Sequence, residues 1–283
     1  MHQTNSIAEL QHLVRTWRQA GENIALVPTM GNLHAGHINL VKRAQTLANR
    51  VIVSIFVNPT QFGPNEDYTN YPRTLTEDTE KLTKNSVDLL FTPECSTIYP
   101  PGASTQVSVH DLSEIHCGAA RPGHFTGVTT IITKLFNIAQ PDLAIFGEKD
   151  FQQLTIIRKM VHDLNIPVSI HSVPTLRESD GLAMSSRNSY LNSEDRTLAP
   201  ILYQTLSEAK RQIEAGKSDF RKMELVYLQQ LQQAGFQPEY FSVCRIDNLS
   251  IATITDKELV ILTAVKLGKT RLIDNILVSL SDS

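Results

Sequence analysis

Two histidines three residues apart, His34 and His37, stand in a short segment whose residue types suit phosphate chemistry. The segment follows an apolar run at Ile24–Val27, which we expect to be a buried strand. It precedes a helix predicted over Gly36–Ala48 by apolar residues spaced three and four apart. Free backbone N–H groups and the helix dipole make a helix N-terminus favourable for an anion. Two imidazole rings on one side can donate hydrogen bonds to phosphate oxygens, so the segment predicts a site for a phosphate-bearing substrate.

A P-loop is excluded, although Gly31 and Gly36 have the spacing of its two glycines. That motif continues with a lysine and then a serine or threonine, whereas His37 and Ile38 follow here. The four residues from His34 to His37 instead resemble the H-x-G-H motif of the nucleotidylyltransferase superfamily. In that superfamily the two histidines stabilise charge while an α-phosphate is attacked.

Further motifs follow in order along the chain. They are Val53–Phe62, which ends in N-P-T-Q-F, Tyr71–Thr74, Arg121–Phe125, Phe146–Gln153, Gly181–Asn188 and Arg271–Asn275. This ordered set resembles the pantothenate synthetase family from Val27 to Asn275, which is essentially the whole chain. The resemblance implies ATP-dependent condensation of pantoate with β-alanine through a pantoyl adenylate, with release of AMP and pyrophosphate. It also implies Mg²⁺ as the companion of ATP, and a homodimer.

The resemblance also implies the site residues. His37, as proton donor, acts with His34 and Lys149 in catalysis, and Gln61 and Gln153 bind pantoate, with Gln61 also near β-alanine. Neutral amides would orient the pantoate carboxylate with less loss of nucleophilicity than a lysine or arginine would cause. The ATP-binding positions are Met30, Gly31, Asn32, Leu33, His34, Ala35, Gly36, His37, Gly147, Glu148, Lys149, Asp150, Leu176, Met184, Ser185, Ser186 and Arg187.

Several roles stay open at this point. Asp150 either binds ribose or orients Lys149, and Asn58 could assist Gln61. Arg121 and His124 either line the same crevice or have a structural role. No dedicated protein site for a metal is predicted. The nearest acidic residues, Glu77 and Asp78, are better explained as a solvated helix face, and no zinc spacing connects His110, His116, Cys117 and His124.

Two other functions compete with this prediction. An enzyme of the same superfamily could transfer AMP to a phosphate-bearing acceptor, but that substrate would call for cationic residues where this chain has Gln61 and Gln153. A non-catalytic nucleotide-binding module should have lost some of the catalytic residues. His34, His37, Lys149 and Ser185–Arg187 are all present.

Composition narrows the class of protein further. The 283 residues carry a net charge of −3, and their 26 basic residues are scattered, which argues against nucleic acid as a partner. No apolar stretch is long enough to span a bilayer. The first residues have neither the basic start nor the apolar core of a signal peptide, and the three cysteines show no C-x-x-C spacing. These features predict a cytoplasmic enzyme with no membrane partner.

The elements that must position these residues alternate through the first part of the chain. Repeated strand–helix–strand units predict an α/β fold, a Rossmann-like doubly wound parallel sheet over residues 1–175 that binds nucleotide and pantoate. Gln61, Lys149 and the H-x-G-H turn each follow a strand, so we expect them in one crevice. The predicted strands are 24–27, 51–57, 87–91, 107–109, 143–146 and 168–173, and the predicted helices are 36–48, 128–139 and 151–164.

The pattern changes at about Leu176. One amphipathic helix begins behind Asn192 and ends at Gly216, and a second runs from Met223 to Gly235. Strands are predicted at 240–246, 259–265 and 271–278. Residues 176–283 are therefore expected to form a smaller α+β domain that acts as a lid.

Overall fold

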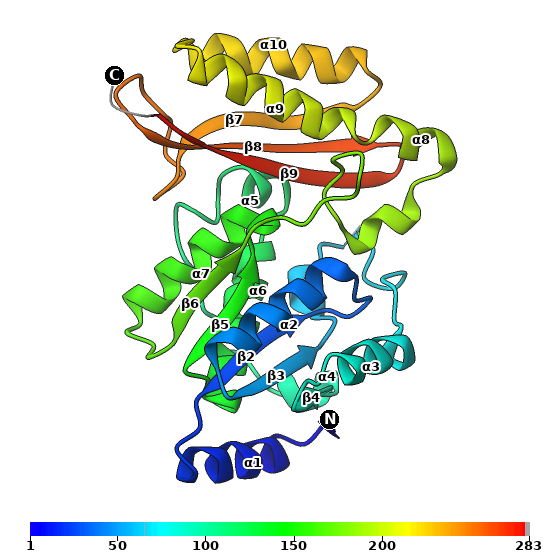
Figure 1. The fold of residues 1–283 in the computed structure, drawn as a ribbon, viewed down its shortest axis with the longest axis vertical. Coiled ribbons are helices and arrows are strands. Elements are labelled where there is room, and N and C mark those ends of the chain that lie inside the picture. The colour runs from blue at the N-terminus through cyan, green and yellow to red at the C-terminus, as the bar shows by residue number, and fades with distance from the viewer. Residues whose placement is uncertain (65, 281–283) are drawn as a thin grey trace. The chain divides into compact units, whose positions relative to one another are not determined.

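The computed structural model describes residues 1–64 and 66–280. It divides into two compact units, of which unit 1 comprises Met1–Glu148 and Gln153–Pro174. Unit 2 comprises Lys149–Gln152 and Thr175–Ser283. Figure 1 labels most of the helices and strands of both.

Unit 1 is built on a six-stranded, wholly parallel sheet in the order β1-β4-β3-β2-β5-β6. The order reverses beside β2, because β3 lies on one side of it and β5 on the other. In such sheets ligands bind at the carboxyl ends of the strands at this reversal. The strands are β1 (His2–Thr4), β2 (Ile24–Thr29), β3 (Arg50–Ile55), β4 (Leu89–Phe91), β5 (Leu143–Gly147) and β6 (Ser169–Val173).

Buried apolar side chains hold this sheet to its helices. The first four residues of β2 are fully buried, as expected for a parallel strand that is covered on both faces. Helix α2 contacts β2, β3 and β5, whereas α6 contacts β2 and α1. The helices are α1 (Ile7–Gln19), α2 (Ala35–Leu47), α3 (Leu75–Lys84), α4 (Cys95–Ile98), α5 (Cys117–Ala120) and α6 (His124–Ala139), with the 3₁₀ turn η1 (Pro59–Gln61). The turn η2 (Glu148–Asp150) and helix α7 (Phe151–Asp163) include residues of both units, because Lys149–Gln152 group with unit 2.

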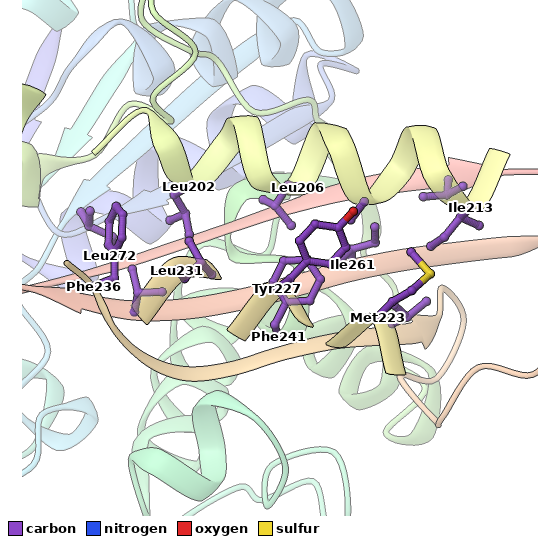
Figure 2. Packing of buried hydrophobic residues seen from close by; sticks show 14 of the residues in the cluster. Leu202, Leu206, Ile213, Met223, Tyr227, Leu231, Phe236, Phe241, Ile261 and Leu272 are labelled. Atoms are coloured by element: carbon purple, nitrogen blue, oxygen red, sulfur yellow. The ribbon is translucent and has the colours of Figure 1, made fainter. Parts of the chain in front are cut away.

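Unit 2 packs two helices on a three-stranded antiparallel sheet in the order β7-β8-β9. Figure 2 shows its core, in which Tyr227 and Phe241 stack with ring centroids 5.2 Å apart. Leu206 of helix α9 and Ile261 of the middle strand, β8, are both fully buried there. The elements are η3 (Ser186–Tyr190), α8 (Ser193–Leu198), α9 (Ile201–Glu214), α10 (Phe220–Gln233), β7 (Gln237–Arg245), β8 (Glu258–Leu267) and β9 (Thr270–Ser279).

The predicted fold class, a doubly wound parallel sheet followed by a smaller α+β part, is confirmed. Two details of the prediction are wrong. Residues 107–109 form no strand, because the backbone N–H and C=O of Val107 bond to the hydroxyls of Thr130 and Thr129 rather than to a neighbouring strand. The helix expected behind Asn192 is two helices, since Pro200 lacks the N–H that a continuous helix needs.

Two elements near the N-terminus were not predicted. Strand β1 has only three residues, too few for a clear pattern. Helix α1 does carry an amphipathic pattern, because Ile7, Leu10, Val14 and Trp17 are spaced three and four apart behind the N-cap Ser6, so its absence from the prediction was an oversight. Within the described part of the chain, no helix combines the length and apolar character needed to cross a membrane.

Candidate active site

The H-x-G-H turn joins the carboxyl end of β2 to the N-terminus of α2. His34 is the N-cap of that helix, and its Nδ1 accepts a hydrogen bond from the backbone N–H of Gly36 at 3.1 Å. In return, the Nδ1 of His37 accepts from the backbone N–H of His34 at 3.3 Å. A backbone N–H can only donate, so each neutral ring carries its proton on Nε2. The ring centroids lie 4.2 Å apart, which makes the pair two adjacent Nε2–H donors.

The backbone before His34 is held by two side chains of α3. The carboxylate of Asp78 accepts from the N–H groups of Asn32 and Leu33, both at 2.8 Å. The ammonium of Lys81 donates to the carbonyl oxygen of Leu33 at 2.8 Å. Asp78 is fully buried, so the expectation that it belongs to a solvated helix face is wrong: it turns inward because the turn offers it two backbone donors.

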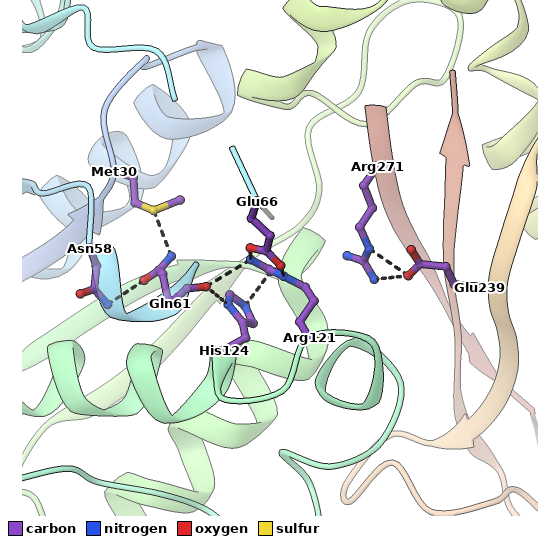
Figure 3. A network of polar contacts seen from close by, with 8 residues as sticks. All are labelled: Met30, Asn58, Gln61, Glu66, Arg121, His124, Glu239 and Arg271. Atoms are coloured by element: carbon purple, nitrogen blue, oxygen red, sulfur yellow. Dashed lines mark hydrogen bonds and ion pairs between the residues drawn. The ribbon is translucent and has the colours of Figure 1, made fainter. Parts of the chain in front are cut away.

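Gln61 is held from both ends of its side chain, as Figure 3 shows. Its Oε1 accepts from the Nδ2 of Asn58 at 3.1 Å, and its Nε2 donates to the sulfur of Met30 at 3.0 Å. Asn58 is buried, and its Nδ2 also donates to the carbonyl oxygen of Gly127. Met30 directly precedes the turn, so Gln61 and the H-x-G-H segment are brought together in unit 1. Asn58 thus contacts Gln61 directly, in line with the prediction that it assists this residue.

The main-chain carbonyl of Gln61 accepts hydrogen bonds from Arg121 and His124. Its oxygen lies 2.8 Å from Nδ1 of His124 and 3.3 Å from Arg121 (Figure 3). Arg121 faces Nε2 of His124 at 3.0 Å. A carbonyl only accepts and a guanidinium only donates, so His124 is neutral with its proton on Nδ1. This is the opposite tautomer to that of His34 and His37.

Glu66 completes this support. Its two carboxylate oxygens accept from Arg121 at 2.6 and 2.5 Å. Partial burial acts to raise the pKa of Glu66, but the hydrogen bonds and charge of Arg121 outweigh it and hold that pKa below its ordinary value. Arg121 and His124 therefore hold the main chain of Gln61, which gives both a structural role. That they also line the predicted crevice stays a prediction.

Lys149 belongs by its contacts to unit 2. Its carbonyl oxygen accepts from the side-chain amide of Asn275, 2.9 Å away on β9, and its ammonium lies 3.9 Å from the carboxylate of Asp150. The neighbouring Asp274 is buried and pairs with Arg177 at 2.7 Å. Burial raises the pKa of Asp274, and the guanidinium of Arg177 opposes that shift. The main chain of Lys149 is thus anchored to a buried ion pair through Asn275.

The serine-rich segment of unit 2 starts the 3₁₀ turn η3. Ser185 caps it by accepting from the backbone N–H of Arg187 at 3.3 Å. The backbone N–H of Met184 donates to the carbonyl oxygen of Leu176 at 3.0 Å, so these two predicted ATP-binding positions are neighbours. Ser185, Ser186 and Arg187 are all partly buried.

Of the other predicted positions, Gln153 lies half-buried on α7, and Gly147 ends β5. Glu148 accepts from the hydroxyl of Ser172 on β6 at 2.8 Å. Residues 1–64 and 66–280 contain no group of three or more histidine, cysteine or acidic residues placed to hold a metal ion. A single crevice that joins the unit 1 residues to Lys149 stays a prediction.

Comparison with known proteins identifies the family. A sequence model described as Pantoate-beta-alanine ligase matches residues 2–277. A pantothenate synthetase of Hahella chejuensis (strain KCTC 2396) is 56% identical over 276 residues, covering 97% of this chain and 98% of that protein. One of Azotobacter vinelandii (strain DJ / ATCC BAA-1303) is 53% identical over 278 residues, covering 98% of both. The chain belongs to the pantoate–β-alanine ligase family.

Solved structures of this family show the same fold. The crystal structure of pantothenate synthetase from Thermus thermophilus has a TM-score of 0.92 and 41% identity, covering 98% of this chain and 99% of that one. A pantoate–β-alanine ligase from Francisella tularensis, complexed with beta-gamma ATP and β-alanine, has a TM-score of 0.81 and 35% identity. In that comparison 98% of this chain and 97% of the other are covered. The chain is therefore a ligase that joins pantoate to β-alanine.

Sequence reasoning missed the residues that support this ligase site from behind. Asp78 and Lys81 lie in the polar run T-E-D-T-E-K, which resembles an exposed helix surface. The available signal was that Asp78 stands four residues before the fully buried Leu82, on the same face of α3. Asn275 was included in a family motif, but nothing in the sequence connects it with Lys149.

Proposed function

We propose that this ligase activates pantoate with ATP through a pantoyl adenylate and then transfers the pantoyl group to β-alanine. The observation that carries the proposal is the capped His34–His37 pair, which presents two Nε2–H donors where α2 begins beside the strand-order reversal. The Francisella tularensis relative, complexed with an ATP compound and β-alanine, supports the same two substrates here.

In the first step a carboxylate oxygen of pantoate attacks the α-phosphorus of ATP. The bond from that phosphorus to the bridging oxygen breaks, and pyrophosphate leaves with the electron pair. Negative charge grows on the α-phosphoryl oxygens and on the leaving group. His34 and His37 stabilise it as hydrogen-bond donors, with His37 as proton donor, and Lys149 adds a mobile positive charge.

Gln61 and Gln153 orient the pantoate carboxylate through amide donors. A neutral donor holds the nucleophile with less withdrawal of electron density than a cation would. Anchoring of the Gln61 side chain by Asn58 and Met30 fixes its direction before substrate arrives. Mg²⁺ enters as the complex of ATP, which requires no separate metal site on the protein.

In the second step the amine of β-alanine attacks the acyl carbon of the adenylate. An amide bond forms, the bond from the acyl carbon to the phosphate oxygen breaks, AMP leaves, and the amine gives up a proton. We propose that Gln61 also lies beside β-alanine.

Ser185, Ser186 and Arg187 bind the β- and γ-phosphates, together with the other ATP-binding positions predicted from the sequence.

Residues 1–175 are proposed to bind nucleotide and pantoate, and residues 176–283 to act as a lid. A lid would exclude water from the adenylate, which is a reactive anhydride. The functional form is proposed to be a homodimer.

The two-step route predicts a specific pattern of exchange between pyrophosphate and ATP. Labelled pyrophosphate should enter ATP when enzyme, Mg²⁺ and pantoate are present and β-alanine is absent. Omission of pantoate should abolish the exchange, because no other group then accepts the adenylyl group.

The same measurement separates the alternatives. A concerted displacement with all three substrates predicts exchange only when β-alanine is added. An adenylyltransferase for phosphate-bearing acceptors predicts no exchange with pantoate, and a non-catalytic binding module predicts none under any condition. A strict requirement for β-alanine would refute the adenylate while leaving the family unchanged.

A further inference from the structure

Asp78 is a buried charged side chain that bonds to the backbone just before His34. Its two carboxylate oxygens accept from consecutive backbone N–H groups, those of Asn32 and Leu33, at 2.8 Å each. A third donor, the hydroxyl of Thr74, lies 3.1 Å away, and the ammonium of Lys81 is 3.9 Å from the carboxylate. None of the Asp78 side chain is exposed. Burying a carboxylate is costly unless it is hydrogen-bonded, so these partners define its place closely.

The peptide that Asp78 holds is an unusual one. Gly31 has φ of +85° and Asn32 has φ of +50°, so two consecutive residues adopt left-handed conformations before the helix begins. Such a conformation costs energy for Asn32 and persists only where the surroundings fix it. A Cβ at Gly31 would meet Asp78 at 3.3 Å and Ile55 at 3.1 Å, which leaves little space for a side chain there.

Lys81 acts on the other polar group of the same peptide segment. Its ammonium donates to the carbonyl oxygen of Leu33 at 2.8 Å, and Leu33 directly precedes His34. One turn of α3 therefore supplies both an acceptor for the N–H groups and a donor for the carbonyl. This fixes the orientation of the peptide that enters the N-cap, and through the reciprocal caps it fixes both imidazole rings.

We propose that Asp78, assisted by Lys81, is the positioning residue for the His34–His37 pair. The proposal rests on the proposed function, because it assigns these histidines to adenylation. Asp78 does not touch the substrate; its carboxylate sets the turn geometry that selects the Nε2–H tautomer of both rings. Loss of that geometry moves the donors away from the developing charge, and small displacements of this kind are costly in rate.

The first test compares Asp78→Asn with Glu80→Gln, an exposed acid on the same helix. The asparagine side chain would present an NH₂ group to one of two backbone donors. We expect pantoate-dependent pyrophosphate exchange to fall about ten- to a hundredfold in kcat, as for a misplaced catalytic group, with the KM for ATP changed less than about threefold. Glu80→Gln should leave both unchanged. An unchanged kcat in folded Asp78→Asn would overturn the proposal.

The second test asks whether Asp78 acts through the histidines. In a His34→Ala/His37→Ala background, Asp78→Asn should cost less than about threefold further, because effects of residues that act as a unit are not additive. An equal factor in both backgrounds would show a general structural role instead. A raised Mg²⁺ requirement with unaltered saturating kcat would assign Asp78 to a metal and also overturn the proposal.

The third test does not depend on activity. ¹⁵N NMR of the imidazoles should show the Nε2–H tautomer for His34 and His37 in the wild type and a mixture in Asp78→Asn. If the wild-type protein showed this tautomer but no pantoate-dependent exchange, the proposed function would fail while the positioning role stood. Retention of the tautomer in Asp78→Asn would refute the positioning. If that variant does not fold, Lys81→Met, which removes the partner of the Leu33 carbonyl, carries the same three tests.

Discussion

The H-x-G-H turn and the support beneath Gln61 solve the same problem in different ways. Both hold a polar side chain by fixing the main chain beside it. The turn rests on the fully buried carboxylate of Asp78, which binds neutral backbone donors. The carbonyl of Gln61 rests on Arg121 and His124, and Arg121 is in turn paired with Glu66, whose side chain is 24% exposed.

The support of the H-x-G-H turn and the support of Gln61 differ in which groups form their bonds and in how exposed those groups are. In the turn, the charged side chains of Asp78 and Lys81 bond directly to backbone N–H and C=O groups, and the Asp78 carboxylate is fully buried. The Gln61 support depends on an ion pair, whose strength varies with solvent screening and with the charge of Glu66. The histidine tautomers follow the same division, with Nε2–H in the turn and Nδ1–H at His124. We therefore expect changes in the two regions to affect different substrates and to respond differently to pH.

The largest effect is expected in the turn. His37→Ala should lower the single-turnover rate of adenylation by about two to three orders of magnitude, as for removal of a transition-state donor. His34→Ala should behave similarly. Binding of pantoate, measured by calorimetry, should change little, because the Gln61 support is untouched. An unchanged single-turnover rate in either variant would remove the histidines from the mechanism.

Gly127→Ala is expected to have a smaller effect, and on pantoate binding rather than on the rate of adenylation. A Cβ at Gly127 would lie 2.4 Å from the carbonyl oxygen of Thr60 and 2.7 Å from the backbone nitrogen of Gln61, so η1 must shift. Overpacking of this kind costs about 1–3 kcal/mol. Calorimetry should show weaker pantoate binding with ATP binding preserved.

Gly63→Ala is the matched control for this prediction. A Cβ at Gly63 would make ordinary contacts, the nearest at 3.6 Å with Glu66. Its pantoate and ATP affinities should both equal those of the wild type. Equal losses for the two substrates in Gly127→Ala would contradict the division between the two regions.

The smallest effect is expected from Glu66→Gln, and it should depend on pH. The pKa of Glu66 is lowered in the folded protein, so its ion pair contributes stability above the pKa of the unfolded chain. That contribution is lost as the pH falls through the lower, folded pKa. Urea unfolding should find the wild type more stable than the variant by about 1 kcal/mol at pH 7, with the difference vanishing in acid. A difference that is constant down to pH 3 would argue against the ion pair.

Residues in contiguous motifs were predictable, and residues that act across the fold were not. The H-x-G-H turn could be read because the strand, the glycines and the helix adjoin in sequence. Asp78 could not, because the Asn32 and Leu33 N–H groups that bury it are about 45 residues away in the chain. A polar helix surface and a buried carboxylate have the same local sequence. Tertiary partners decide between them.

The fold shows the same limit. Apolar runs identified β2, β3 and β5, since burial on both faces leaves a strong signal. The alternating Val107–Val109 segment carried a strand pattern, yet its backbone bonds are taken by Thr129 and Thr130 of α6. An apolar sequence pattern indicates which residues are buried. It does not indicate which groups form hydrogen bonds with the backbone N–H and C=O groups.

The attachment of Lys149 to Asn275 has a consequence for how the two units are connected. Because residues 149–152 group with unit 2, the chain passes between units at 148/149, 152/153 and 174/175, three times rather than once. Cutting the chain at 174/175 alone would therefore leave residues 149–152 attached to unit 1. A fragment that begins at Thr175 would also lack the lysine segment that its own β9 strand holds.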